Sequence, residues 1–178
     1  MSADLEALGW GPDFAEGLAA AGDGSLVPGR VAVERRKSLE VWTADGPVSA
    51  TVSGRLRHTA AGRGDLPVVG DWVGVLANGP GGGMAIHAVL PRRTAFRRKA
   101  AGNRIEEQVV ASNVDTVFLV TGLDEDFNLR RIERYLTVAW DSGARPVVVL
   151  NKADLCADLD ARVADVERVA PGVDVVQV

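Results

Sequence analysis

The hydrophobic pattern of the chain changes period at about residue 113, and this change most constrains the fold. Between Arg30 and Val89, apolar and polar residues alternate in short runs separated by turn residues. Beyond residue 113, near-continuous apolar runs alternate with segments whose apolar residues recur at helical spacing. Alternating runs are typical of half-buried strands, and continuous apolar runs are typical of buried parallel strands. The sequence therefore predicts a β domain followed by an α/β domain.

Five short alternating runs predict five strands in the first domain. The runs are 31–33, 39–42, 48–52, 71–75 and 84–89. Turn residues separate them at 45–47, 62–67 and 79–83, and the glycine-rich last segment is interpreted as a hairpin turn. Five strands in about 60 residues predict a small barrel of the OB type, spanning 28–92. Trp42 and Trp72 are expected to pack in the core and at the rim rather than stack on bases.

The second domain is predicted to alternate strands and helices. Strands are expected over 114–120, 146–150 and 173–178, and helices over 128–141 and from Leu159 to Ala170. Asn128 is a candidate N-cap and Gly143 ends the first helix. This order is half of a doubly wound α/β domain, which leaves a parallel sheet with an uncovered edge and a small core.

The tetrapeptide Asn151-Lys152-Ala153-Asp154 directly follows the strand predicted over 146–150. Open α/β sheets bind ligands beyond the carboxyl ends of their strands. There, Asp154 can accept two hydrogen bonds from the N1–H and exocyclic amino group of guanine, whereas adenine offers no matching pair of donors. Asn151 can hydrogen-bond the base edge, and the Lys152 stem can lie across the purine. The motif therefore predicts a guanine-reading site of the kind found in GTPases.

Composition narrows the class of protein. The 178 residues contain one cysteine, Cys156, which excludes an internal disulfide framework and any Cys-rich zinc site within this chain. No apolar run reaches about 18 residues, so no membrane span is expected. The first ten residues lack the basic-then-apolar order of a signal peptide. A cytoplasmic protein is the simplest expectation.

Charge is distributed unevenly along the chain. Residues 1–27 carry five acids and no Lys or Arg, whereas residues 28–100 carry twelve Lys/Arg and five Asp/Glu, a balance of +7. A basic segment between acidic ones suggests an anionic partner, most often nucleic acid. The candidate RNA-binding residues are Arg30, Arg55, Arg57, His58, Arg63, Arg92, Arg93, Arg97 and Arg98. Few aromatic residues interleave them, so phosphate and shape contacts are expected rather than base reading.

The order of these features resembles the ribosome small-subunit-dependent GTPase A family of circularly permuted GTPases. In this family the phosphate loop follows the base-reading motif, and this chain has no G-x-x-x-x-G-K-[ST] before its motif or elsewhere. Eight stretches match in the family's order over about 130 residues, beginning with Gly29-Arg30-Val31 and ending with Leu150 to Leu155. Those between are 54–57, 67–73, 90–94, 107–109, 113–115 and 127–136.

The resemblance implies a barrel that contacts ribosomal RNA and a GTPase that hydrolyses GTP on the small ribosomal subunit. It divides the chain into a lead-in (1–27), an OB-type barrel (28–92), a basic linker (93–113) and the first part of a permuted GTPase domain (114–178). Only Asn151, Lys152 and Asp154 carry over, as contacts to GTP or GDP. Mg²⁺ and Zn²⁺ are implied only by family segments missing here, so no catalytic or metal residue is named. The chain is expected to be an inactive N-terminal portion, and a monomer.

Two other functions compete with this one. A non-enzymatic OB-fold RNA-binding module would use the basic barrel alone. A dinucleotide-binding oxidoreductase is poorly supported, because no G-x-G-x-x-G follows the strand at 114–120.

Overall fold

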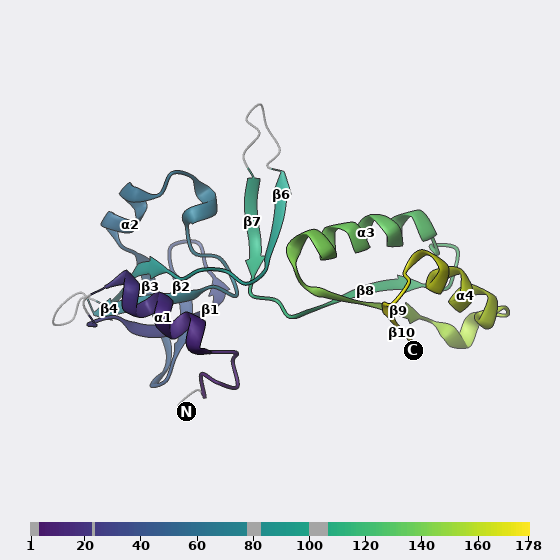
Figure 1. Cartoon of the computed structure of the whole chain (residues 1–178), viewed down its shortest axis with the longest axis horizontal. Helices are drawn as coiled ribbons and strands as arrows, with labels where there is room; N and C mark the ends of the chain where they lie inside the picture. The colour runs from purple at the N-terminus through teal and green to yellow at the C-terminus, as the bar shows by residue number, and fades with distance from the viewer. Residues whose placement is uncertain (1–3, 23, 78–82, 100–106) are drawn as a thin grey trace. The chain divides into compact units, whose positions relative to one another are not determined.

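The structure is a computed structural model that describes residues 4–22, 24–77, 83–99 and 107–178. It contains two compact units, residues 1–113 and 114–178, which are described separately (Figure 1). No helix in these described ranges combines the length and apolar character needed to cross a membrane.

Five strands of the first unit close into a barrel, as the alternating runs predicted. They are β1 (Val27–Glu34), β2 (Leu39–Thr43), β3 (Gly46–Val52), β4 (Trp72–Ala77) and β5 (Met84–Val89). Their order around the barrel is β1-β2-β3-β5-β4, with β3 and β5 parallel and the other pairs antiparallel. The predicted turn at 79–83 falls largely outside the described residues, which resume at Gly83.

Alternation along the strands builds the barrel core. Every second residue of a strand points to the same face, so each strand contributes apolar side chains to the interior. The buried cluster consists of Val31, Leu39, Val41, Ala50, Val73, Val75 and Ile86. Closure pairs the strands all round and leaves no open sheet edge in the barrel.

The lead-in packs on the barrel through α1 (Pro12–Ala21). Phe14 of α1 is 1% exposed and lies against Trp72, with ring centroids 5.7 Å apart. Trp10 meets Trp72 edge-on at 4.8 Å. Trp72 is therefore a core residue, whereas Trp42 is 40% exposed on the outside of β2. The packing expected of the two tryptophans is thus confirmed for Trp72.

Four elements of the first unit were not predicted. A short helix, α2 (Gly54–Thr59), begins at Ser53, whose side chain accepts a hydrogen bond from the Leu56 amide, and the 3₁₀ turn η1 (Arg63–Asp65) follows. Residues 93–113, expected to form a basic linker, contain the antiparallel strands β6 (Ala95–Lys99) and β7 (Glu107–Ser112). Both strands are short, and neither shows the alternating apolar pattern that marks the barrel strands in the sequence.

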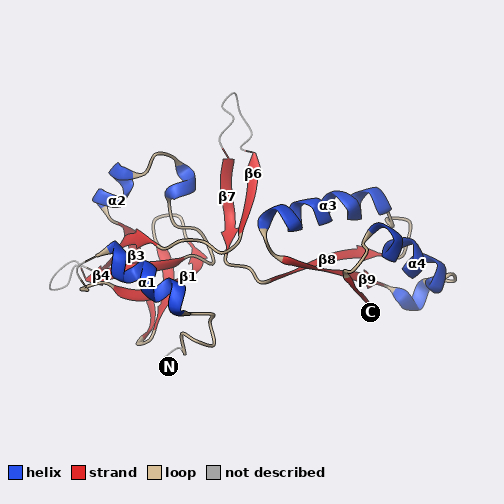
Figure 2. Cartoon of the chain, viewed as in Figure 1, coloured by secondary structure: helices blue, strands red, loops and turns tan. Residues whose placement is uncertain are grey.

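The second unit is a three-stranded parallel sheet with two helices (Figure 2). Its elements are β8 (Thr116–Gly122), α3 (Leu129–Ser142), β9 (Arg145–Asn151), the 3₁₀ turn η2 (Ala153–Leu155), α4 (Leu159–Val169) and β10 (Asp174–Gln177). The strand order is β10-β9-β8, with β9 in the centre. This agrees with the predicted strand and helix alternation.

Both helices contribute to one core. Ile132 and Leu136 of α3 and Val166 of α4 pack with Val148 and Leu150 of β9. In each strand, the residues that alternate with these core residues point to the other face of the sheet. There Phe118 is 64% and Val120 61% exposed. The helices thus form a core on one face of the sheet and leave apolar side chains exposed on the other.

Candidate functional site

The predicted guanine-binding motif, residues 151–154 and called the guanine motif below, lies where the central strand β9 ends. Asn151 is the last residue of β9, and its carbonyl accepts a hydrogen bond of 2.9 Å from the Leu123 amide beyond β8. On the other side, the Ala153 amide donates to the Val178 carbonyl at 3.0 Å. The motif is therefore fastened to the ends of both neighbouring strands, at the ligand-binding edge of an α/β sheet.

Lys152 turns the chain sharply out of β9. It has a left-handed backbone conformation, with φ 64° and ψ 37°, which is uncommon for a residue with a side chain. The Asn151 side-chain oxygen accepts a hydrogen bond of 2.9 Å from the Lys152 amide. Asn151 thus braces the turn that leads into η2.

The Asp154 carboxylate lies on η2 and is exposed. Within the described part of the chain it has no hydrogen-bond or ion-pair partner. A carboxylate without an internal partner retains both oxygens for a ligand, so Asp154 is able to accept the paired donors of guanine.

The ammonium group of Lys152 forms an ion pair with Asp124, in the loop after β8. The hydrogen bond from Lys152 holds the pKa of the Asp124 carboxyl below its ordinary value, and the same bond raises the pKa of Lys152. Both groups are charged near neutral pH. Asp124 was not predicted from the sequence, because its loop contains no recognisable motif.

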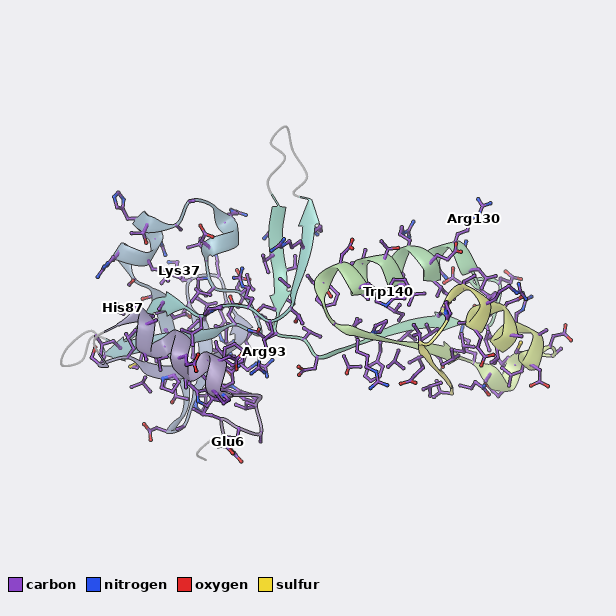
Figure 3. The ribbon with its side chains drawn as sticks, viewed as in Figure 1. Glu6, Lys37, His87, Arg93, Arg130 and Trp140 are labelled. Carbon is purple, nitrogen blue, oxygen red and sulfur yellow. The ribbon has the colours of Figure 1, made fainter. Side chains whose placement is uncertain are left out.

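Three of the candidate RNA-binding arginines make contacts inside the first unit. Arg30 donates to the carbonyls of Leu8 and Asn113 and lies over the Trp72 ring, with 5.8 Å to its centroid. Arg93 pairs with Asp13 and stacks on Phe14, 4.3 Å from the ring centroid. Figure 3 shows Arg93 beside α1. These two side chains hold the lead-in against the barrel.

Arg92 belongs to a buried network. Its Nε and Nη2 atoms donate to the two Asp71 oxygens, both at 2.7 Å, and other bonds reach the Gly64 and Leu66 carbonyls. Asp71 is fully buried and also accepts from the Ser112 hydroxyl and, at 2.8 Å, from the Val68 amide. The network connects the barrel to η1 and to the end of β7. Neither Asp71 nor Ser112 was recognised from the sequence.

The other candidates lie on α2, η1 and β6: Arg55, Arg57, His58, Arg63, Arg97 and Arg98. All six side chains are exposed. One groove is lined by Leu56 of α2, Asp65 of η1 and Arg97 of β6, so these three elements share a surface.

The metal ions implied by the family do not fit the residues present. No group of three His, Cys, Asp or Glu side chains that could hold a metal occurs among the described residues. The chain also lacks the phosphate-loop Lys and Ser/Thr that would face a nucleotide-bound Mg²⁺.

Comparison with known proteins shows what the chain is similar to. A small ribosomal subunit biogenesis GTPase RsgA of Opitutus terrae is 53% identical over 93% of this chain and 47% of its own length. The protein of that name from Syntrophotalea carbinolica is 42% identical over 97% of this chain and 49% of its own. The chain thus spans about half the length of these curated relatives.

Solved structures show the same fold. YjeQ from Thermotoga maritima superposes with a TM-score of 0.66 at 23% identity, over 85% of this chain and 51% of that one. YloQ, a circularly permuted GTPase, superposes with a TM-score of 0.64 at 18% identity, over 86% of this chain and 52% of that one. The chain therefore has the fold of about half of each of these structures, in agreement with the fold class expected from the sequence.

The family assignment rests on the second half of the chain. The sequence pattern of the RsgA GTPase family matches residues 89–178, which include β9 and the guanine motif. The chain belongs to the RsgA GTPase family.

Proposed function

We propose that this chain is the guanine-reading and RNA-binding portion of a GTPase that assists late maturation of the small ribosomal subunit. The observation that carries the proposal is the placement of Asn151, Lys152 and Asp154 at the carboxyl end of the central strand β9. The relatives' names, which specify small ribosomal subunit biogenesis, supply the process.

The guanine site supports recognition of GTP and GDP. Asp154 would pair with the N1–H and exocyclic amino group, and the Lys152 stem would lie along the purine. Against adenine, the carboxylate would lose the paired donors and face an acceptor instead. Leaving a charged group unpaired costs on the order of a few kcal/mol, which is enough for strong discrimination once the site is closed.

Hydrolysis requires parts that this sequence does not contain. GTPases catalyse phosphoryl transfer by positioning water and stabilising charge around a phosphate loop and Mg²⁺. No G-x-x-x-x-G-K-[ST] is present in the 178 residues. In the proposed parent enzyme, the chain selects the base, and this chain alone hydrolyses GTP no faster than the background reaction.

The barrel unit is proposed to bind ribosomal RNA through the surface shared by α2, η1 and β6. The residues proposed to contact phosphates are Arg55, Arg57, Arg63, Arg97 and Arg98. Arg30, Arg92 and Arg93 support this surface indirectly, because their contacts hold the lead-in and η1 to the barrel. In this proposal residues 1–27, 28–92 and 93–113 act together, and 114–178 carries the nucleotide site.

A non-enzymatic RNA-binding module is the second candidate. It is favoured by the same basic surface. The two candidates differ in how nucleotide and salt affect binding, because phosphate contacts weaken steeply with salt while the guanine site adds a requirement for the correct base.

Nucleoside titrations of the chain, followed by NMR, test the proposed function. We expect guanosine to shift the amide signals of 151–155 at lower concentrations than adenosine does. Equal responses to both nucleosides would contradict guanine reading, and together with salt-dependent RNA binding that ignores GTP and GDP they would favour the RNA-binding module.

A further inference from the structure

Asp124 lies next to the guanine motif because β8 and β9 are parallel neighbours in register. Gly122, the last residue of β8, pairs with Asn151, the last residue of β9. The chain then continues through Leu123, whose amide donates to Asn151, to Asp124. A side chain two residues beyond β8 can therefore reach a side chain one residue beyond β9.

The loop that carries Asp124 is fixed by its own hydrogen bonds. The Asp124 carboxylate accepts a hydrogen bond of 3.1 Å from the Asp126 amide, and the backbone carbonyl of Asp124 accepts one of 3.1 Å from the Phe127 amide. Asp126 in turn pairs with Arg131 of α3, with 3.0 Å between Nη1 and Oδ1. The Asp124 carboxylate is thus presented from a structured turn.

Gly122 leaves the space that this carboxylate occupies. A Cβ atom built on Gly122 would lie 2.8 Å from Asp124 Oδ1, closer than real Cβ atoms approach. The carboxylate is held by the turn and by Lys152, so a side chain at position 122 would displace it. Glycine at the end of β8 is therefore part of the arrangement.

Lys152 is the residue whose side chain Asp124 holds in place. Its backbone is set by the left-handed turn and its ammonium by Asp124, so both ends of the side chain are fixed. A free lysine stem samples many rotamers and loses that freedom when a ligand orders it. A stem that is fixed before binding has already lost this rotamer freedom, so ordering it adds no further entropic cost when the ligand binds.

We propose that Asp124 is a positioning residue of the guanine site: it fixes the Lys152 stem as a preformed surface for the purine ring. This inference rests on the proposed function, since it concerns the same site. Asp124 acts through Lys152 and makes no contact with the base itself.

The test uses the whole chain and guanosine as the probe. Asp124→Asn should weaken guanosine binding about two- to fivefold, the range for an exposed ion pair. Asp124→Glu should recover part of the loss, and Gly122→Ala should reproduce it. Asp160→Asn removes an equal charge from the exposed start of α4 and should leave the affinity unchanged.

Salt and the lysine signal give readouts that a purely structural role would not alter. Because salt screens exposed charges, wild-type affinity should fall towards that of Asp124→Asn as NaCl rises, while the variant stays constant. The ¹⁵N signal of the Lys152 ammonium should be seen in the wild type and lost in Asp124→Asn.

The outcomes separate this inference from the proposed function. Guanosine preference with an unchanged Asp124→Asn affinity, or with a loss that persists at high salt, overturns the role of Asp124 and leaves guanine reading intact. Absence of any guanosine preference in the wild type overturns both. An unchanged Lys152 ammonium signal in Asp124→Asn also overturns the positioning role.

Discussion

At the residue scale, similar charged groups have different roles because their burial differs. Asp71 and Arg92 form an inward-facing pair, with side-chain exposures of 0% and 16%. Arg35 and Glu40 form an outward-facing pair, exposed to 60% and 28%. Breaking a buried pair leaves a desolvated charge, whereas exposed pairs contribute little. A run of arginines in the sequence therefore cannot by itself identify a binding surface.

Asp71→Ala tests the buried network. We expect it to lower the free energy of unfolding by about 3–5 kcal/mol, because Arg92 and the Val68 amide lose their acceptor. The measurement is urea unfolding at neutral pH. Asp45→Ala, at an exposed turn, serves as control and should leave the midpoint unchanged. Similar midpoints for the two variants would contradict a stabilising role for the network.

The Asp13–Arg93 pair predicts a pH dependence. The hydrogen bond from Arg93 lowers the pKa of Asp13 below its ordinary value of 3.8. A lowered folded-state pKa gives stability that is present above the unfolded-state pKa and lost as pH falls through the folded value. Asp13→Asn should therefore destabilise the chain at pH 7 and converge with the wild type below pH 3.8.

Urea midpoints of wild type and Asp13→Asn across this pH range provide the measurement for the pair. Glu16→Gln, on the same helix, is the matched control and should show no such convergence. A difference between wild type and Asp13→Asn that persists undiminished in acid would contradict the assignment.

At the scale of elements, the sequence predicted those with strong local signals. The five barrel strands followed from alternation, and α3 followed from its apolar spacing, its Asn128 cap and Gly143. Gly143 has a φ of 84°, the left-handed conformation common where helices end. The α2 helix and the β6–β7 pair were missed because they are short and their sequences show no apolar period.

The same reasoning explains how much of the site could be predicted. Asn151, Lys152 and Asp154 form a contiguous motif after an apolar strand, so the sequence alone indicated their location at the end of β9. Asp124 is 28 residues from Lys152 and becomes its partner only through strand register. Asp71 and Ser112 are 41 residues apart and meet only in the folded unit.

Asn128→Ala tests the start of α3. The Asn128 side chain accepts a hydrogen bond of 3.1 Å from the Arg131 amide, and losing such a cap costs about 1 kcal/mol. Thermal or urea unfolding should show this loss, and Asn128→Ser should retain most of the stability because serine also caps. Equal losses in both variants would contradict the capping role.

At the scale of the whole molecule, the two compact units have different surfaces. The barrel unit presents arginines on α2, η1 and β6, and Figure 3 shows Arg130 projecting from α3 of the second unit. The second unit exposes apolar side chains on one sheet face, including Phe118, Val120 and Val176. Parallel sheets are usually covered on both faces, so this face is an incomplete layer in the chain as described.

RNA binding is predicted to depend on the barrel unit and on salt. Replacing Arg57, Arg63 or Arg98 singly with Gln should weaken binding to ribosomal RNA similarly for all sequences and reduce the salt slope by about one. Arg145→Gln, in an exposed pair with Asp174 of the second unit, is the charge-matched control. A slope that changes for Arg145→Gln alone would contradict the placement of the RNA surface.

The measurement that most directly tests the central claim is the base preference of Asp154→Asn. Xanthine carries a carbonyl where guanine has its amino group, and an asparagine amide offers one donor and one acceptor to match it. Binding of guanosine and xanthosine should be compared by NMR titration of the wild type and the variant. We predict that the preference reverses, from guanosine in the wild type to xanthosine in the variant. An unchanged preference in the variant would contradict the assignment of Asp154 as the residue that reads guanine.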